Sequence, residues 1–365
     1  MLDLSQLDAT TQDTLRRCGF ETIPFEALVA RLARDGVGSN RLPGPIALPE
    51  PDALTGLDAL SDAERARLAA LGQEAISSGA VGVAILNGGM ATRFGGVPKG
   101  AATALDGRSF LDLKLSQIAA ASGGHAPVLL MNSFATERAT QAHLAELGRE
   151  ARCFNQMVSL RLTPEGQLFR EADGGPSLYA PGHGDFVPAL RHSGALRRFL
   201  DEGGRFLTLS NVDNLGASLD PVVIGAHIDG GRPMSVELVR TRPGDVGGFP
   251  ALVNGRLIIV EAFRAPSGFD VGRAPVFNTN TFVFDAAALD ADFELSWFAV
   301  AKQVDGRPAI QFERLVNQLT EHLDTSWLVT PREGAASRFV PIKVPSDLVD
   351  SAPQLRAVLR AQGVL

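Results

Sequence analysis

The sequence predicts an α/β fold in which a mostly parallel central sheet is flanked by helices. From residue 81 onward, short apolar runs alternate with longer helical stretches, which is typical of strands connected through crossover helices. The runs are continuously apolar, as buried parallel strands usually are. The chain has 365 residues, 45% of them hydrophobic, so it can bury a substantial core. Strands are expected at 81–86, 128–131, 206–210, 234–239, 257–260 and 281–284.

Residues 1–78 are expected to form a helical N-terminal region ahead of the sheet. Apolar residues have helical spacing over 25–32, and four prolines between residues 43 and 51 then mark a linker. Ser61 and Glu64 form an S-x-x-E capping box that opens a second helix. The remaining boundaries are expected at 79–350 for the α/β domain and at 351–365 for a short C-terminal tail.

Charge and composition exclude several function classes. The net charge is −7 and no stretch concentrates Lys and Arg, so nucleic acid is not an expected partner, although a few local cations can still bind phosphate. Cys18 and Cys153 lie far apart, which argues against a disulfide framework or structural zinc. The first residues are acidic and no apolar run reaches 18 residues, so we expect no export, no membrane partner and a cytoplasmic location.

The loop after the first predicted strand, LNGGMATRFGGVPKG (86–100), is the most informative segment. Ligands in such sheets bind beyond the carboxyl ends of the strands. Gly88 and Gly89 let the backbone approach a ligand and present N–H groups to it, whereas Arg93 and Lys99 supply cations. The glycines alone would indicate only a tight turn; with both cations, the loop indicates a phosphate-bearing ligand. It matches neither GxxxxGK[ST] nor GxGxxG, which disfavours a P-loop ATPase and a Rossmann dehydrogenase.

This loop resembles that of a known family. L-N-G-G-M-A-T-R-F-G...P-K is similar to the L-x-G-G-x-x-T-R-x-G...P-K loop of the UTP:glucose-1-phosphate uridylyltransferase and UDP-N-acetylhexosamine pyrophosphorylase group. The resemblance covers about residues 80–350 and implies a GT-A-like, Rossmann-type nucleotidyltransferase that joins UTP to a sugar 1-phosphate, glucose 1-phosphate by default. It also implies that Gly88 and Gly89 contact the nucleotide and that Arg93 and Lys99 contact the triphosphate and the reacting phosphate.

Further motifs follow in the family's order. The resemblance implies that Gln156 of CFNQ reads the uracil edge, and an amide can offer a donor and an acceptor to such a base. It implies that Gly182 of APGHGD faces the base and that His183 binds a phosphate oxygen. SNVDNLG ends an apolar strand, so Asp213 can hold Mg²⁺ against phosphates, with Asn211 at the nucleotide. A surface amide, a loop histidine and a helix cap are the corresponding structural alternatives.

Three later segments, DVGGFP, IIVEAF and FNTNTF, are expected to bind the sugar, because hydroxyl recognition needs carboxylates and amides. Gly248 would give backbone access, and Glu261 lies inside an apolar run, which is unusual for a carboxylate without a role. Alternation in FNTNTF predicts that Asn278 and Asn280 share one face of a strand. The alternative for this pair is a solvent-facing polar strand.

The last motif is RFVPIKVPSDL (338–348), which resembles the family's F-x-P-V-K-x-x-x-D-L and implies that Lys343 contacts the phosphates. The implied reaction is an in-line attack of a sugar-phosphate oxygen on the α-phosphorus of UTP, without a covalent nucleophile. The chain departs from the family at Asn87 and Ala91, and at Val246, where a lysine often stands.

Other readings of these motifs stay open. A nucleotide-sugar-dependent glycosyltransferase could use NVDN as its metal site, and a non-catalytic UDP-sugar-binding protein could keep the same fold. N-acetylglucosamine 1-phosphate and galactose 1-phosphate are alternative sugars. No feature of the sequence specifies an oligomeric state.

Overall fold

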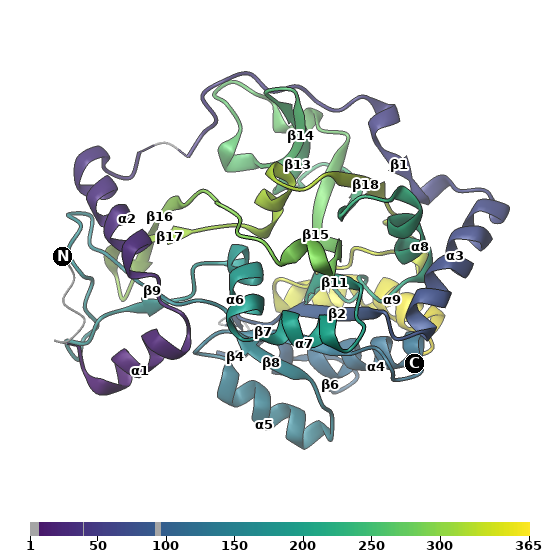
Figure 1. Ribbon diagram of the computed structural model, residues 1–365, viewed down its shortest axis with the longest axis horizontal. Helices are drawn as coiled ribbons and strands as arrows, with labels where there is room; N and C mark the ends of the chain where they lie inside the picture. The colour runs from purple at the N-terminus through teal and green to yellow at the C-terminus, as the bar shows by residue number, and fades with distance from the viewer. Residues whose placement is uncertain (1–6, 39, 92–95) are drawn as a thin grey trace.

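The computed structural model describes residues 7–38, 40–91 and 96–365, and its centre is an eight-stranded sheet of order β1-β18-β12-β15-β11-β2-β7-β8 (Figure 1). Neighbouring strands are parallel except around β15, which is antiparallel to both β11 and β12. The predicted mostly parallel sheet is therefore confirmed. The strands are β1 (Thr55–Gly56), β2 (Val81–Leu86), β7 (Val128–Asn132), β8 (Arg152–Asn155), β11 (Phe206–Asn211), β12 (Met234–Arg240), β15 (Val276–Asp285) and β18 (Thr325–Val329).

Five of the six predicted strands belong to this sheet. The sixth, at 257–260, lies in β14 (Arg256–Glu261), which pairs with β13 (Gly248–Val253) in a separate antiparallel hairpin. A second hairpin joins β16 (Phe298–Val304) and β17 (Arg307–Glu313). An apolar run shows that a segment is buried but does not say against which partner, so the sheet to which each strand belongs could not be assigned from the pattern.

Two apolar cores lie on opposite faces of the sheet, and β2 contributes to both because its side chains alternate. Val83 and Ile85 join the core that contains α3, α4, α5, α8 and α9, whereas Ala84 joins the core that contains α6 and α7. These helices are α3 (Asp62–Ser77), α4 (Phe110–Ser122), α5 (Glu137–Leu147), α6 (Phe186–His192), α7 (Ala195–Asp201), α8 (Pro221–Gly230) and α9 (Pro345–Ala361).

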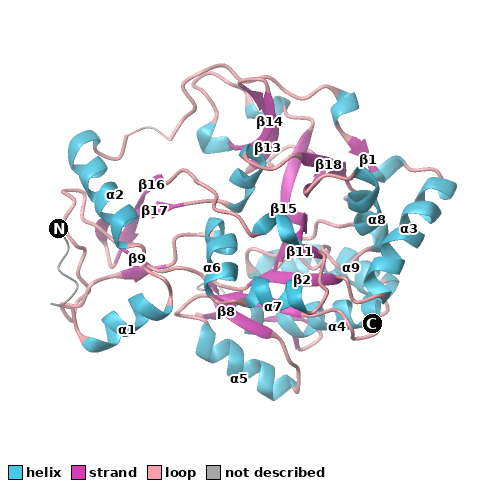
Figure 2. Ribbon diagram, in the orientation of Figure 1, coloured by secondary structure: helices cyan, strands magenta, loops and turns pink. Residues whose placement is uncertain are grey.

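The residues expected to form a helical N-terminal region are divided between two parts of the molecule. Helices α1 (Ala9–Arg17) and α2 (Thr22–Asp35) build a separate core with β17 and with residues 158–162. Helix α3, which opens with the predicted Ser61–Glu64 capping box, packs on α8 at the other side of the molecule, and β1 joins the main sheet (Figure 2). At the other end of the chain, residues expected as a tail are largely helical because α9 continues to Ala361.

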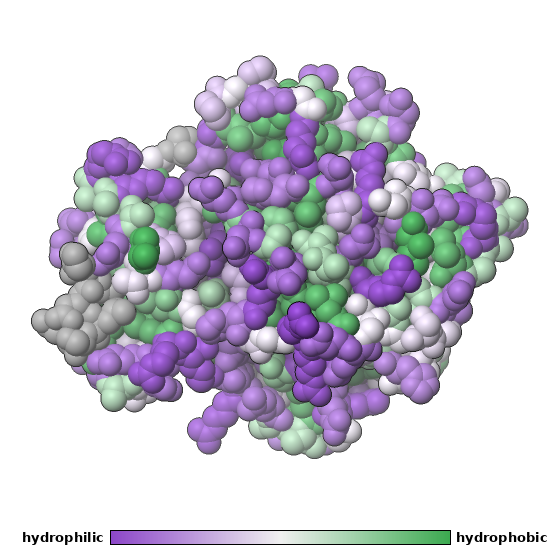
Figure 3. Space-filling model, viewed as in Figure 1, coloured by the Kyte–Doolittle hydropathy of each residue, from purple (hydrophilic) through white to green (hydrophobic). Residues whose placement is uncertain are grey.

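The surface is mostly hydrophilic, as expected for a chain in which 21% of the residues are charged. On the face shown in Figure 3, hydrophilic residues cover most of the area and apolar residues form scattered small groups. None of the helices in the described part of the chain combines the length and apolarity that a bilayer crossing requires.

Candidate active site

The two most informative loops leave adjacent parallel strands at the same edge of the sheet. Leu86, the last residue of β2, pairs with Asn211, the last residue of β11, and the amide of Val212 donates to the carbonyl of Leu86 over 3.2 Å. The glycine loop and Asp213 therefore begin side by side. This is the edge at which ligands bind in α/β sheets.

Asp213 lies within electrostatic range of three lysine side chains. Burial raises the pKa of its carboxyl group, and the positive charges of Lys99, Lys114 and Lys343 act against that rise. The whole chain contains four lysines among 34 basic residues, so only Lys302 lies outside this group. Lysine provides a compact point charge that the bulkier guanidinium does not replace, so this concentration indicates a site for small anionic groups. We call Asp213 and these three residues the lysine cluster.

Lys99 is held in the cluster by the glycine loop. Its amide donates to the carbonyl of Gly89 over 3.1 Å, and its side chain is 9% exposed with Nζ 4.8 Å from the centre of the Phe110 ring. The backbone amide of Gly100 donates to Oδ1 of Asn87 over 3.0 Å. The side-chain Nδ2 of Asn87 donates to Asn132 of β7 and to Thr140 of α5. Asn87, one of the departures from the family pattern, therefore anchors this loop. Arg93, also predicted for the site, lies outside the described residues.

Lys343 reaches the cluster from the segment before α9. It is exposed, its own amide donates to the Asp347 carboxylate over 2.6 Å, and the amide of Ile342 donates to the carbonyl of Asp213 over 3.1 Å. These backbone bonds place Lys343 beside Asp213 although 130 positions separate the two in the chain.

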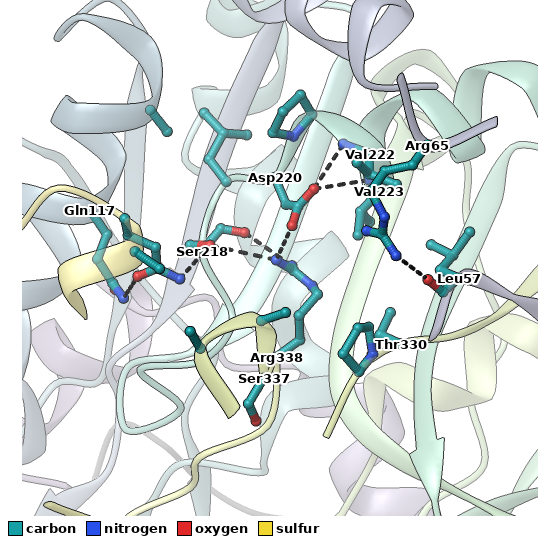
Figure 4. A pocket seen from close by; sticks show the side chains of 18 of the residues that line it. Leu57, Arg65, Gln117, Ser218, Asp220, Val222, Val223, Thr330, Ser337 and Arg338 are labelled. Carbon is teal, nitrogen blue, oxygen red and sulfur yellow. Dashed lines mark hydrogen bonds and ion pairs between the residues drawn. The ribbon is translucent and has the colours of Figure 1, made fainter. Parts of the chain in front are cut away.

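A buried arginine fixes the start of this segment. The guanidinium of Arg338 makes a bidentate pair with Glu237 at 2.5 and 2.7 Å and a third contact with Asp220 at 3.2 Å. Figure 4 shows Arg338 and Asp220 at a cavity of about 360 Å³ between α3, α4, α8 and α9, whose described lining includes none of the predicted site residues. Breaking such a buried pair costs about 3–5 kcal/mol, so it anchors the Lys343 segment firmly.

Lys114 is the member of the lysine cluster that sequence reasoning missed. It lies on α4, is 1% exposed, and donates from Nζ to the carbonyls of Asn214, over 2.7 Å, and Ala217. Burial lowers the pKa of Lys114 to about 7, and either protonation state keeps two N–H donors for these two acceptors. A lysine inside the apolar run FLDLKLSQIAAA was the available signal, because lysine is almost never fully buried unless it has partners.

A second group of predicted residues meets on the neighbouring side of the glycine loop. A Cβ at Gly88 would lie 2.1 Å from Oε1 of Gln156, so a side chain at this position would displace the Gln156 amide. Nε2 of Gln156 donates to the carbonyl of Gly182 over 3.5 Å, and Gly182 has φ +102°, a left-handed value that favours glycine. We call Gly88, Gln156, Gly182 and the adjacent His183 the amide cluster.

His183 is held in one tautomer. Its Nδ1 accepts from the amide of Val316 over 3.0 Å, and burial lowers the pKa of His183 to about 4. The ring is therefore neutral at pH 7 and carries its proton on Nε2. It can donate one hydrogen bond to an oxygen atom of a ligand without adding a charge.

The predicted sugar-binding residues Gly248 and Glu261 pair directly across the β13–β14 hairpin. A Cβ at Gly248 would lie 2.8 Å from Oε1 of Glu261, and the Asn317 amide donates to this same oxygen. Burial raises the pKa of Glu261, while the Asn317 hydrogen bond and Arg264 act against the rise. Asn317 lies in the short 3₁₀ helix η10 (Val316–Glu321) and was not predicted, because no local pattern connects it with a hairpin 56 residues earlier.

The predicted alternation of Asn278 and Asn280 is wrong. The pairing of β15 with β12 shifts register between Glu237 and Leu238, and Asn280 adopts φ +56° within this bulge. Oδ1 of Asn278 accepts from the Asn280 amide, and Nδ2 of Asn280 donates to Oδ1 of Asn211, each over 3.0 Å. Asn280 thus connects β15 to Asn211, the residue predicted to lie at the nucleotide. Asparagine is one of the few side chains that tolerate this backbone conformation, a signal that the sequence contained.

The described residues contain no group of three or more His, Cys, Asp or Glu side chains suited to hold a metal ion. The lone carboxylate of Asp213 is compatible with Mg²⁺, which usually takes one or two protein carboxylates and completes its shell with phosphate oxygens and waters. The magnesium assignment stays a prediction.

Comparison with known proteins shows the family of the chain. The family model described as UTP–glucose-1-phosphate uridylyltransferase matches residues 25–358. The chain belongs to this family. The uridylyltransferase family match extends ahead of the sheet to residue 25 and therefore includes most of α2.

Curated relatives of the same name are longer than this chain. The protein from Encephalitozoon cuniculi is 30% identical over 280 residues, which cover 72% of this chain and 56% of that protein. The protein from Musa acuminata is 31% identical over 286 residues, covering 72% of this chain and 60% of the other. The chain thus spans less than two thirds of the length of these two relatives.

Solved structures share the fold. A UDP-glucose phosphorylase from Trypanosoma brucei aligns with a TM-score of 0.75 and 24% identity, covering 92% of this chain and 76% of its own. The UDP-N-acetylglucosamine pyrophosphorylase from the same organism aligns with a TM-score of 0.76 and 18% identity, covering 94% and 79%. The predicted α/β fold of this enzyme group is therefore confirmed.

Proposed function

We propose that this chain transfers a uridylyl group from UTP to glucose 1-phosphate and releases pyrophosphate. The lysine cluster carries the proposal: the charges of three lysines act on one carboxylate, which follows the carboxyl end of β11 beside that of β2. Family membership and the name shared by the curated relatives support this reaction and this sugar.

The reaction brings two polyanions together, so its main requirement is positive charge at fixed positions. Lys99 is nearly buried and held by backbone and ring contacts, so its ammonium changes position little during the reaction. Lys343 is exposed and sits on an anchored segment, which suits a group that meets an entering sugar phosphate. Lys114 donates to the loop that carries Asp213 and acts as a positioning residue. Positioning and charge account for the chemistry without a covalent nucleophile.

Mg²⁺ is the expected cofactor, with Asp213 as its protein ligand. When bound, the ion would neutralise phosphate charge and polarise the phosphoryl oxygens. The neighbouring ammonium groups favour the ionised form of Asp213, which is the form that binds a cation.

The amide cluster would recognise the uracil and the phosphate region. The Gln156 side chain offers both a donor and an acceptor, and neutral His183 offers one N–H donor. Glu261 would accept from a sugar hydroxyl through Oε2, since Asn317 already donates to Oε1. A partly buried carboxylate used in this way disfavours sugars without that hydroxyl.

Pyrophosphate release tests the proposal. The protein is incubated with UTP, Mg²⁺ and each of glucose, galactose and N-acetylglucosamine 1-phosphate, and pyrophosphate and the UDP-sugar are quantified. We expect release that requires both substrates and is fastest with glucose 1-phosphate. Absence of release with all three sugars would contradict the proposed function.

Mn²⁺ binding, followed by electron paramagnetic resonance in the presence of UTP, should weaken in Asp213→Asn. The cytoplasmic location stays a prediction that cell fractionation tests.

A further inference from the structure

Arg314, the first residue after β17, holds the loop that carries Gly182 and His183. Its amide donates to the carbonyl of Pro181 over 3.0 Å, and its carbonyl accepts from the amide of Gly184 over 2.9 Å. A Cβ at Gly184 would lie 2.4 Å from the carbonyl carbon of Arg314, so the two backbones are in direct contact. Together with the bond from Val316 to His183, the residues after β17 hold this loop at several points.

The Arg314 side chain also holds this loop. Its Nε donates to Oδ1 of Asp185, a fully buried residue just before α6, over 2.6 Å. Its guanidinium carbon lies 4.3 Å from the centre of the Trp297 ring. The remaining edge of the guanidinium donates to Glu21 over 2.5 Å. The planar guanidinium therefore bridges two carboxylates, and the one on Glu21 comes from the opposite end of the chain.

Glu21 belongs to the junction between α1 and α2, which also contacts the segment after Gln156. The amide of Val158 donates to the carbonyl of Cys18 over 3.2 Å, and a Cβ at Gly19 would lie 2.8 Å from Cε of Met157. Residues 18–21 thus contact Met157 and Val158, which follow Gln156, directly, and they reach residues 181–185 through Arg314. The apolar core that α1 and α2 form with β17 and residues 158–162 supports the junction.

We propose that the α1–α2 region sets the base selectivity of the enzyme, with Glu21 and Arg314 as positioning residues. The inference rests on the proposed function. Uracil and cytosine differ only in the donors and acceptors of one edge, so discrimination depends on where a few protein groups are held. Residues 18–21 join the two loops that would carry those groups. Loosening this junction should therefore weaken recognition of the correct base more than it weakens the fold.

The variant Glu21→Gln tests the inference, because it removes one charge and keeps the shape. The Glu21 side chain is 35% exposed, and the Arg314–Asp185 pair stays complete, so the variant should fold. We expect the ratio of kcat/KM for UTP to that for CTP to fall by about three- to tenfold, the size of effect that one misplaced hydrogen bond produces. KM for UTP should rise, while KM for glucose 1-phosphate stays within about twofold.

Two companion variants control the experiment. Asp35→Asn removes an acid from α2 whose partner Arg34 is the preceding residue, and it should leave the UTP-to-CTP ratio unchanged. Glu21→Asp restores the charge on a shorter side chain and should recover part of the ratio. An unchanged UTP-to-CTP ratio of kcat/KM in Glu21→Gln would overturn the inference. Equal rises in KM for UTP and for glucose 1-phosphate would also overturn it.

Calorimetry separates this inference from the proposed function. If the wild-type protein released no pyrophosphate, the proposed reaction would be wrong. The affinities of wild type and Glu21→Gln for UTP and CTP would still measure base selectivity. A wild type that prefers UTP, next to a variant in which this preference is lower, supports the inference in either case, and equal preferences contradict it.

Discussion

The lysine cluster and the amide cluster lie at one edge of the sheet but are held together differently. Around Asp213, charged groups converge from three distant parts of the chain, and buried ionic contacts such as Arg338–Glu237 fix the segments that carry them. Around Gln156, the side chains that would face the base are uncharged and lie against glycines, while the buried Arg314–Asp185 pair fixes the loop behind them. The difference teaches that charge is concentrated where phosphates would react, and close packing is used where the base would be read.

Among the changes to the lysine cluster, removal of the Lys99 ammonium should reduce turnover most strongly. We expect Lys99→Ala to fold and to lose turnover by at least about a hundredfold, as deletion of a preorganised transition-state donor usually does. Steady-state pyrophosphate release from UTP plus glucose 1-phosphate measures this. Lys302→Ala is the matched control, because it removes the one lysine outside the cluster, and it should stay near the wild-type rate. A near wild-type rate in Lys99→Ala would exclude Lys99 from the mechanism.

A smaller loss is expected for Lys343, which is exposed and acts through a partly aqueous environment. Turnover of Lys343→Ala should fall by roughly ten- to a hundredfold because water weakens its interaction with the phosphates. The same assay should show a steeper loss at low ionic strength than at high ionic strength, since salt screens an exposed charge. An effect independent of salt would show that Lys343 acts through structure instead.

Two glycine variants sharpen the uncharged side. Gly88→Ala would push its methyl group onto the Gln156 amide, and we expect KM for UTP to rise by about tenfold, the equivalent of one lost hydrogen bond. A Cβ at Gly89 would meet no atom of the described residues within 4 Å, so thermal unfolding of Gly89→Ala should match that of wild type. If Gly89→Ala raises KM for UTP without changing thermal unfolding, the added methyl group must contact the bound UTP and not the rest of the protein. Unchanged KM in both variants would remove this loop from base recognition.

A change in stability rather than in activity is expected for His183 as the pH is lowered. Its pKa is about 4 in the folded protein and near 6.5 in the unfolded chain, so the unfolded state binds more protons between these values. Wild-type stability should therefore fall, relative to His183→Asn, as pH drops from 6.5 to 4, by up to about 3 kcal/mol. Above pH 7 the difference should stay constant. Urea unfolding of both proteins at several pH values measures it, and a pH-independent difference would show that His183 titrates normally.

The features that could be predicted from the sequence are those that depend on local sequence patterns. The continuous apolar runs located the strands, Ser61 and Glu64 located a helix start, and the glycine loop located the site edge. The contacts that tighten the site were missed, because they join residues with no local relationship: Asn317 with Glu261, Arg314 with Glu21, and Lys114 with the Asp213 loop. The β15 bulge was missed because strict alternation assumes an unbroken strand.

Affinities for UTP and uridine, measured side by side by calorimetry, test the central claim most directly. The claim is that charge at the lysine cluster holds the phosphates while the amide cluster holds the base. In the double variant Lys99→Ala/Lys343→Ala, UTP affinity should fall by about a hundredfold, the equivalent of two charge-assisted hydrogen bonds, with uridine affinity unchanged. In Gly88→Ala both affinities should fall by the same factor. Equal losses of UTP and uridine affinity in the double lysine variant would contradict the account.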